Sequence, residues 1–256
     1  MIEAARVAES LAGWVKSEVT EAGAGGIILG LSGGVDSAVV AALAKRAFPD
    51  THLALILPLH TAAADVDDAR RVVDEFGLKA KTIELDPVYD SLARILGADP
   101  AVEEQPDLAL ANLKARLRML VLYYHANRFR YLVAGTGNRS QLSIGYFTKF
   151  GDGGADLMPL GHLVKSEVVE LARYLEVPQT VIEKPPSADT WRGHTDEGEL
   201  GFTYEQLEQY VLGSLEDDSV RQRITTLRRN SSHKLRTPKL PPPTSAMAHQ
   251  TSTTDS

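Results

Sequence analysis

Two spacings of apolar residues alternate along this chain, one typical of buried strands and the other typical of amphipathic helices. Short continuous apolar runs predict strands at residues 27–29, 52–57, 80–85, 131–134 and 157–160. Apolar residues three and four positions apart predict helices at residues 38–48, 65–76, 90–96, 108–128 and 165–175. This alternation predicts an α/β fold, doubly wound, with a mostly parallel sheet and helices on both faces.

The connection between the first strand and the first helix is a glycine-containing loop that runs from Gly30 to Ser37. Gly33 and Gly34 lack Cβ atoms, so backbone N–H groups can close around an anion, and the N-terminus of the following helix adds partial positive charge. Ligands of parallel sheets bind beyond the carboxyl ends of the strands, where this loop lies. The predicted phosphate-binding residues are Gly30, Leu31, Ser32, Gly33, Gly34, Val35, Asp36 and Ser37.

Asp36 belongs to the first turn of that helix. Its carboxylate would be repelled by a bound polyphosphate unless a Mg²⁺ ion stood between them, which predicts a metal. The loop fails the Walker pattern because no Lys precedes the hydroxyl residue. An ordinary strand-to-helix turn capped by Ser32 or Asp36 is the structural alternative. The whole string resembles the loop of the N-type ATP pyrophosphatases, which implies their adenine nucleotide alpha-hydrolase-like fold.

The composition is ordinary for a globular protein with one main domain: 256 residues, 43% hydrophobic and 24% charged. The net charge of −7 argues against a broad nucleic-acid-binding surface, which needs clustered positive charge. The N-terminus carries Glu3, Arg6 and Glu9 and does not read as a signal peptide, and no apolar run approaches the length of a membrane span. We therefore expect a cytoplasmic protein that binds neither nucleic acid nor membranes.

The end of the chain differs in composition from the rest. From Thr237 onward it is rich in Pro, Ser and Thr, and it carries too few apolar residues to order itself by burial. We expect one domain at residues 1–236 and a disordered tail at residues 237–256. A proline-rich docking segment is the functional alternative for the tail.

Two further segments contain too much glycine and too many polar residues for a core. The first follows the fourth strand, at residues 135–141 and 145–157, and its glycines indicate a loop whose backbone approaches a ligand. The second comprises residues 184–189 and 195–204, and its acidic and glycine residues are typical of a flexible lid.

Taken together, these blocks resemble the ammonia-dependent NAD synthetase family. The matching segments are residues 30–37, 112–118, 135–138, 146–156, 184–189, 195–202 and 232–234. The resemblance extends over nearly everything from Val7 to Thr237. It implies a ligase reaction in two steps: the carboxylate of deamido-NAD attacks the α-phosphate of ATP and releases pyrophosphate, and ammonia then displaces AMP to give NAD.

The resemblance also implies roles for individual residues. Asp36, Lys165 and Asp152 would be catalytic, and Mg²⁺ would be the cofactor. ATP would contact the Gly30 to Ser37 loop together with Thr136, Lys165 and Ser187. Deamido-NAD would contact Arg116, Lys149, Asp156, His233 and Lys234. Structural alternatives remain for each, such as a solvated helix face for Arg116 or a turn for Asp152.

One position departs from the family pattern. Where relatives commonly carry a Glu as a second Mg²⁺ ligand, this chain has Gln141, which offers a neutral carbonyl oxygen. Mg²⁺ tolerates carbonyls and waters as ligands. We therefore expect Asp36 and phosphate oxygens to do most of the coordination, with Gln141 as a further candidate metal ligand.

The nitrogen source follows from what the chain lacks. The sequence contains no cysteine, which excludes disulfides, thiolate metal sites and a cysteine nucleophile within this chain. No stretch remains for an amide-hydrolysing domain, so free ammonia is the predicted donor, although a separate glutaminase partner stays open. Asp152, Asp196 and Glu197 are the candidates to accept the proton of ammonium. Closure of the two loops should keep water from the adenylate.

Other interpretations stay open at this level. A GMP-synthetase-like amidation would share the Asp36 loop, and an ATP-binding sensor would bind the nucleotide without releasing pyrophosphate. The predicted helix at residues 108–128 has more apolar positions than one buried stripe needs, which indicates either burial on both sides or a subunit interface. The family resemblance implies a homodimer, which would bring Arg116 to a site shared between subunits.

Overall fold

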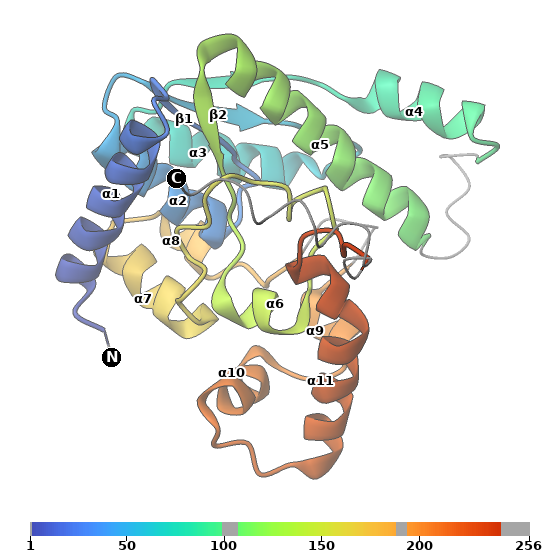
Figure 1. The fold of residues 1–256 in the computed structure, drawn as a ribbon. Coiled ribbons are helices and arrows are strands. Elements are labelled where there is room, and N and C mark those ends of the chain that lie inside the picture. The colour runs from blue at the N-terminus through green and yellow to red at the C-terminus, as the bar shows by residue number, and fades with distance from the viewer. Residues whose placement is uncertain (1, 99–106, 188–193, 242–256) are drawn as a thin grey trace, which may run out of the picture.

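The computed structural model describes residues 2–98, 107–187 and 194–241, and within them a parallel four-stranded sheet forms the centre (Figure 1). The strand order is β3-β2-β1-β4. β1 (Gly26–Gly30) pairs with β2 (His52–Ile56) and with β4 (Tyr131–Ala134), and β3 (Ala80–Thr82) lies at the edge beside β2. The predicted α/β fold is confirmed, and the glycine loop after β1 starts from an inner strand.

One face of the sheet carries the largest core. Its helices are α1 (Ala4–Glu21), α2 (Val35–Ala47), α3 (Ala63–Phe76), α7 (Lys165–Tyr174) and α8 (Gln179–Ile182). Ile27 and Leu29 of β1 join all five helices in one buried cluster. α2 is rich in alanine and is buried along most of its length, so it can pack closely against β1, α1 and α7.

The opposite face is covered by α4 (Asp86–Ile95) and α5 (Leu108–Phe129). Ile28 points to this face because side chains alternate along a strand, and it packs in one cluster with Tyr89 and Leu117. Helices on both faces make the fold doubly wound, as predicted. α5 also keeps four large apolar side chains at the surface: Leu108, Leu120, Tyr124 and Phe129. The excess apolar positions of this helix are therefore not explained by burial in the core.

A third buried cluster joins the helices of the C-terminal part. These are α6 (Arg139–Ile144), α9 (Asp196–Leu200), α10 (Tyr204–Leu212) and α11 (Asp218–Ser231), followed by the 3₁₀ helix η1 (Ser232–Leu235). Ser231 Oγ donates to the carbonyl oxygen of Ile144 at 2.6 Å, which ties the end of α11 to the end of α6. In Figure 1, α10 and α11 lie below α6 and α7.

The observed elements differ from the sequence prediction in several places. The third strand ends at Thr82, α4 begins at Asp86, and the expected strand at 157–160 is only a bridge between Leu157 and Ala134. α1 was not predicted, although its apolar residues have helical spacing and pack into the largest core. α6 and α9 are short helices inside polar, glycine-containing segments. α10 and α11 were not predicted either.

The expected tail falls largely outside the described residues. Residues 237–241 are exposed, and residues 242–256 are not described. The division into a domain at residues 1–236 and a disordered tail therefore stays a prediction. Among the described helices, none combines the length and the apolar surface that a bilayer span requires.

Gly33 gives a test of the loop geometry. Its φ is +82°, and a Cβ atom there would overlap the carbonyl oxygen of Asp65 in α3. We expect Gly33→Ala to lower the free energy of unfolding by about 1–3 kcal/mol, because it adds both backbone strain and a clash. Gly13→Ala, in open space on α1, is the control and should raise that free energy by about 0.5–1 kcal/mol. Urea denaturation measures both, and a Gly33→Ala protein as stable as the wild type would contradict this geometry.

Candidate active site

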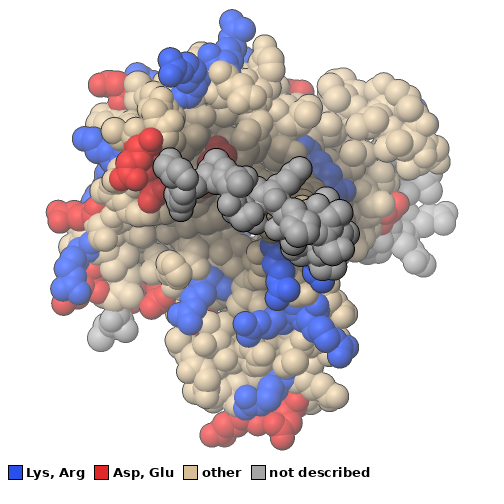
Figure 2. Space-filling model, viewed as in Figure 1, with Lys and Arg blue, Asp and Glu red and all other residues tan. Residues whose placement is uncertain are grey.

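A cavity of about 500 Å³ opens beyond the carboxyl ends of the strands. Gly30, Ile56 and Ala134, the last residues of β1, β2 and β4, all line it. Figure 2 shows a hollow at the centre of one face, with Lys and Arg side chains gathered below it. Figure 1 places α11, which carries four Arg residues, in that lower region. The cavity thus lies where a parallel sheet binds its ligands, and positive charge surrounds its lower approach.

The loop after β1 is organised around its own hydroxyl groups. Ser37 Oγ donates to the Gly34 carbonyl oxygen at 2.8 Å and accepts from the Ser32 backbone N–H at 3.2 Å. Ser32 Oγ accepts from the Gly34 backbone N–H at 3.2 Å. These bonds fix the turn into α2, whose first residues line the cavity. A helix N-terminus carries partial positive charge, so this turn can hold an anion.

Asp36 is held by donors from two other helices. Its Oδ2 forms an ion pair with Lys165 Nζ at the start of α7, and its Oδ1 accepts from Asn138 Nδ2 at 2.8 Å at the N-cap of α6. The Asp36 and Lys165 side chains are only 17% and 9% exposed. Lys165 Nζ also lies 5.7 Å from the centroid of the Tyr204 ring. The structure therefore brings Asp36 and Lys165, which the sequence assigned to one site, into direct contact.

Gln141 lies in the first turn of α6, beside Asn138. Its Oε1 accepts from the Asn138 backbone N–H at 3.2 Å, and Asn138 Oδ1 accepts from the Gln141 backbone N–H at 3.1 Å, which together form a capping box. Gln141 Nε2 donates to Tyr204 Oη at 3.4 Å. The carbonyl oxygen of Gln141, a candidate metal ligand from the sequence, therefore accepts a hydrogen bond in the helix cap, and its role as a metal ligand stays a prediction.

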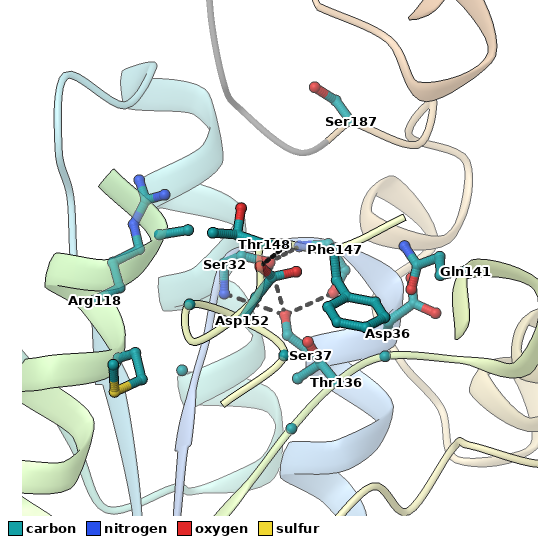
Figure 3. Close-up of a pocket in the computed structure, with 18 of the residues that line it drawn as sticks. Ser32, Asp36, Ser37, Arg118, Thr136, Gln141, Phe147, Thr148, Asp152 and Ser187 are labelled. Atoms are coloured by element: carbon teal, nitrogen blue, oxygen red, sulfur yellow. Dashed lines mark hydrogen bonds between the residues drawn. The ribbon is translucent and has the colours of Figure 1, made fainter. Parts of the chain in front are cut away.

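Asp152 lies between the two sides of the cavity. Figure 3 shows Asp36 and Gln141 on one side of it and Arg118 on the other. Asp152 Oδ1 accepts from the Thr148 backbone N–H at 2.8 Å. Enclosure by protein raises the pKa of this carboxyl, while the Thr148 bond and the charges of Lys234 and Arg118 act in the opposite direction. The side chain is open to the cavity, so solvent limits the rise.

Three cationic residues that line the cavity were not selected from the sequence: Lys114, Arg118 and Lys184. Arg118 donates from Nε to the Leu57 carbonyl oxygen and from Nη2 to Thr61 Oγ1, both at 3.1 Å. Lys184 forms ion pairs with two carboxylates of α3, those of Asp65 and Asp68. In the sequence, only their presence in the family-like blocks pointed to a role for these residues. The packing of the helices decides which of several basic residues point into the cavity.

The two carboxylate partners of Lys184 also affect the pKa of its ammonium group. Burial acts to lower the pKa of its ammonium group, but the hydrogen bonds and charges of Asp65 and Asp68 outweigh it and raise the pKa overall. Lys184 is therefore a cation at neutral pH. It connects the segment after α8 to α3 beside the phosphate-binding loop.

A cluster of polar side chains in and around the segment predicted as a lid lies at the cavity wall. Tyr146 Oη donates to Glu199 Oε2 at 2.7 Å, and Asp196 Oδ1 lies 3.3 Å from the same hydroxyl oxygen. His194 Nε2 lies 2.9 Å from the same Glu199 oxygen. Ser187 Oγ, an expected ATP contact, lies 3.1 Å from His194 Nδ1. This cluster links the segment around α9 to the glycine-rich loop. Ala188, Asp189 and the residues up to 193 lie outside the described parts of the chain.

The structure separates the three candidate proton acceptors. Asp152 and Asp196 line the cavity. Glu197 instead accepts from the Tyr204 backbone N–H at 2.8 Å, at the start of α10. All three carboxylates have a hydrogen-bond partner in the protein, and of the three only Asp152 and Asp196 line the cavity.

The expected dinucleotide contacts divide between the cavity and its surroundings. Lys234 lines the cavity and donates to the carbonyl oxygens of Gly145 and Phe147, at 2.8 and 2.7 Å. Arg116 donates to the Lys149 carbonyl oxygen at 3.3 Å on the exposed side of α5. The other three expected contacts, Lys149, Asp156 and His233, are not among the residues that line the cavity.

Asp156 has two structural partners. Its Oδ2 accepts from the Val133 backbone N–H at 2.7 Å, and its Oδ1 accepts from Tyr123 Oη at 3.0 Å. These bonds tie the glycine-rich loop to β4 and α5. The structural role is visible, and the expected contact with deamido-NAD stays a prediction.

The residues around Asp36 can be compared with what Mg²⁺ requires. Among the described residues, no group of three His, Cys, Asp or Glu side chains is arranged to hold a metal. Mg²⁺ is usually bound by one or two carboxylates together with substrate phosphates. Asp36, beside the phosphate-binding loop, fits that pattern. The site therefore suits a Mg²⁺ ion held jointly with a nucleotide and provides no cage of protein atoms alone.

A glycine loop that leads from β1 into α2, with a Lys–Asp pair beside it, defines an α/β protein with a phosphate-binding cavity. The chain belongs to the NAD synthase family, whose family model matches residues 7–238. It is 49% identical over 234 residues to the NH(3)-dependent NAD(+) synthetase of Carboxydothermus hydrogenoformans, with 91% of this chain and 96% of that protein covered.

Solved structures show the same relationship. The NMN synthetase from Francisella tularensis is similar with a TM-score of 0.88 and 36% identity, covering 94% of this chain and 100% of that one. The NH3-dependent NAD synthetase from Campylobacter jejuni is similar with a TM-score of 0.77 and 28% identity, covering 93% and 99%. The predicted family is confirmed.

Asp196 provides a test of the electrostatics of this site. It is 3% exposed, and burial raises the pKa of its carboxyl against the Tyr204 hydrogen bond and the charges of His194 and Lys165. The stability linked to a raised carboxyl pKa is present in full below the unfolded value of about 3.9 and is lost as pH rises through the folded pKa. The free energy of unfolding of the wild type should therefore rise relative to that of Asp196→Asn as pH falls from 8 towards about 4.5.

Asp217→Asn is the matched control, with the opposite sign. The hydrogen bonds that Asp217 accepts at the start of α11, first from Ser219 and then from Val220, lower the pKa of its carboxyl. Stability from that group is present above the unfolded pKa and is lost as pH falls through the folded pKa. Urea denaturation across the pH range measures both differences. Parallel curves for the wild type and Asp196→Asn would contradict the account of Asp196.

Proposed function

We propose that this chain is an ammonia-dependent ligase that converts deamido-NAD to NAD with ATP. An oxygen of the nicotinate carboxylate attacks the α-phosphorus of ATP, and the bond to pyrophosphate breaks. The nitrogen of ammonia then attacks the activated carbonyl carbon, AMP leaves, and a base takes the proton. The observation that supports this most is the Asp36–Lys165 pair beside the α2 N-terminus, in a chain 49% identical to an NH(3)-dependent NAD(+) synthetase.

The nucleotide subsite would follow the wall formed by β1, α2 and α7. The Gly30 to Ser37 loop and the α2 N-terminus would hold phosphate oxygens, and Thr136 and Ser187 line the same cavity. Negative charge develops on pyrophosphate as it leaves, so an ammonium group placed there stabilises the transition state. Lys165 is buried beside the loop and would act in this way by position.

Mg²⁺ would be held by Asp36 together with phosphate oxygens, and it would neutralise charge on the nucleotide. The residues of the chain supply the remaining contacts. Arg118 and Lys184 add positive charge to the cavity walls, which favours an anionic ligand.

The dinucleotide would extend from the cavity towards the surface beside α5 and η1. Lys234 lies at the cavity, and Arg116, Lys149 and His233 lie further out. These positions, with Asp156, are proposed as deamido-NAD contacts on the family pattern. For the second step, Asp152 and Asp196 are the proposed proton acceptors because both line the cavity. The cluster around Tyr146 would keep water from the activated carboxyl.

A direct assay tests this reaction. The purified protein is incubated with Mg²⁺, ATP and deamido-NAD, with either ammonium or glutamine, and NAD, AMP and pyrophosphate are followed. We expect equal amounts of NAD and AMP with ammonium and none with glutamine, because the chain contains no cysteine nucleophile for glutamine hydrolysis. Bound ATP without release of pyrophosphate would support the sensor interpretation instead.

A second candidate substrate is nicotinate mononucleotide. It is favoured by the fit to the NMN synthetase from Francisella tularensis, which has a TM-score of 0.88, against 0.77 for the Campylobacter jejuni NAD synthetase. The chemistry at the carboxylate would be the same, and only the adenylate half of the ligand would be missing. The ratio of kcat/KM for the two substrates in the assay above decides between them.

We also propose that the chain forms a homodimer through α5. The exposed apolar side chains of this helix include Leu120 and Tyr124, at 62% and 60% exposure. Exposed apolar patches of this kind mark interaction surfaces. Arg116 lies on the same helix, so such a dimer would place it near the partner subunit. A cytoplasmic location stays a prediction from the sequence.

Light scattering after size-exclusion chromatography tests the dimer. We expect the wild type to elute as a dimer and Leu120→Glu as a monomer, because a charge cannot be buried there without a partner. Leu212→Glu, at an equally exposed position at the end of α10 (64%), is the control and should remain dimeric. A monomeric wild type, or equal behaviour of the two variants, would contradict the interface on α5.

A further inference from the structure

The hydrogen bonds of Gln141 determine which end of its amide faces which partner. One end meets the backbone N–H of Asn138 at 3.2 Å. A backbone N–H can only donate, so the atom that meets it has to be the oxygen, Oε1. This bond belongs to the capping box that starts α6, and reversing the amide would place two donors against each other.

The other end of the amide gives the same orientation independently. It meets Tyr204 Oη at 3.4 Å, and the single hydrogen of that hydroxyl is donated to Asp196 Oδ2 at 2.8 Å. Burial raises the pKa of Tyr204 far above its ordinary value, so the hydroxyl stays protonated. Tyr204 Oη can therefore only accept from Gln141, and the group that it meets has to be the NH2 of the amide. The contacts at both ends of the side chain therefore give the same orientation of the Gln141 amide.

The amide nitrogen carries a second hydrogen, and Gln141 lines the same cavity as the phosphate-binding loop. Gln141 is half-buried and lines the cavity together with Asp36 and Thr136 (Figure 3). An N–H group donates to anionic oxygens and repels cations. Its position therefore suits a phosphate oxygen and not a metal ion.

The charge balance at Asp36 supports the same conclusion. Both oxygens of this carboxylate already have donors from the protein, Asn138 Nδ2 and the ammonium group of Lys165. Gln141 adds no negative charge to this group. A carboxylate at position 141 would place a charged oxygen near Asp36, in a cavity that has to accept a polyphosphate, and a divalent cation would be needed to offset the repulsion.

We propose that Gln141 is a hydrogen-bond donor to the bound nucleotide rather than a metal ligand. With an amide at this position, ATP binding would depend less on Mg²⁺ than it would with a carboxylate there. The inference rests on the ATP site of the proposed function. It assigns Mg²⁺ to Asp36 and the phosphates alone.

Gln141→Glu tests the inference because it keeps the cap. A carboxylate oxygen can still accept from the Asn138 N–H, so α6 should form as before, and thermal unfolding checks this. The control is Gln206→Glu, which makes the same change in the capping box of α10. There Gln206 Oε1 accepts from the Thr203 backbone N–H at 2.9 Å, away from the cavity.

The measurement is calorimetric binding of α,β-methylene ATP to the wild type, Gln141→Glu and Gln206→Glu, first in EDTA and then with increasing Mg²⁺. In EDTA, we expect Gln141→Glu to bind about ten-fold more weakly than the wild type or worse, because an attractive contact becomes a repulsive one. The difference should shrink or reverse at high Mg²⁺. Gln206→Glu should match the wild type throughout. Mg²⁺ alone should bind Gln141→Glu more tightly than the wild type.

The results separate this inference from the proposed function. Suppose that the wild type binds the analogue with Mg²⁺, and that in EDTA Gln141→Glu binds it as tightly as the wild type does. The donor role of Gln141 is then wrong, and the ATP site stands. Equal binding of Mg²⁺ alone by the two proteins would likewise overturn the inference. If the wild type binds no analogue even with Mg²⁺, the ATP site itself is wrong and the inference falls with it.

Discussion

The contact between Asp36 and Lys165 is the interaction on which the geometry of the site depends. Asp36 lies in the first turn of α2, Lys165 is the first residue of α7, and Asn138, which binds the other Asp36 oxygen, is the N-cap of α6. Three helices therefore start around one carboxylate. Loss of one partner from a buried ion pair typically costs about 3–5 kcal/mol, because the other charge is left buried. The pair fixes where these helices begin, and with them the edge of the cavity.

The cations of the cavity share one property, which is that each has a partner within the protein. Lys165 is paired with Asp36, Lys184 with Asp65 and Asp68, and Lys234 with two backbone carbonyl oxygens. These contacts offset the desolvation of charges in a partly closed space. An anionic ligand has to compete with these protein groups for the same cations. Ligand binding therefore replaces existing contacts of the cations with contacts to the ligand. Such an exchange is a physical route by which ligand binding can move the segment that carries Lys184.

The C-terminal helices reach the nucleotide side of the cavity through a chain of polar contacts. Gln141 of α6 donates to Tyr204 at the start of α10, and Tyr204 donates to Asp196 of α9. Tyr146 joins Asp196 to Glu199, so the glycine-rich loop belongs to the same chain. Gln141 is therefore connected to both the cap of α6 and the segment around α9.

The sequence by itself determined the sheet, the phosphate-binding loop and the family, because these depend on local periodicity and on short continuous motifs. Residues such as Gly33 and Asp36 lie within one short stretch of the chain, and their chemistry can be derived from their order. The sequence could not show that Lys184 and Arg118 line the cavity, that Asp156 connects β4 to α5, or that the oxygen of Gln141 belongs to a helix cap. α10 and α11 were missed as well, since their apolar faces have meaning only against α6. These features depend on which side chains meet across long sequence separations, and only the packing of the helices decides that.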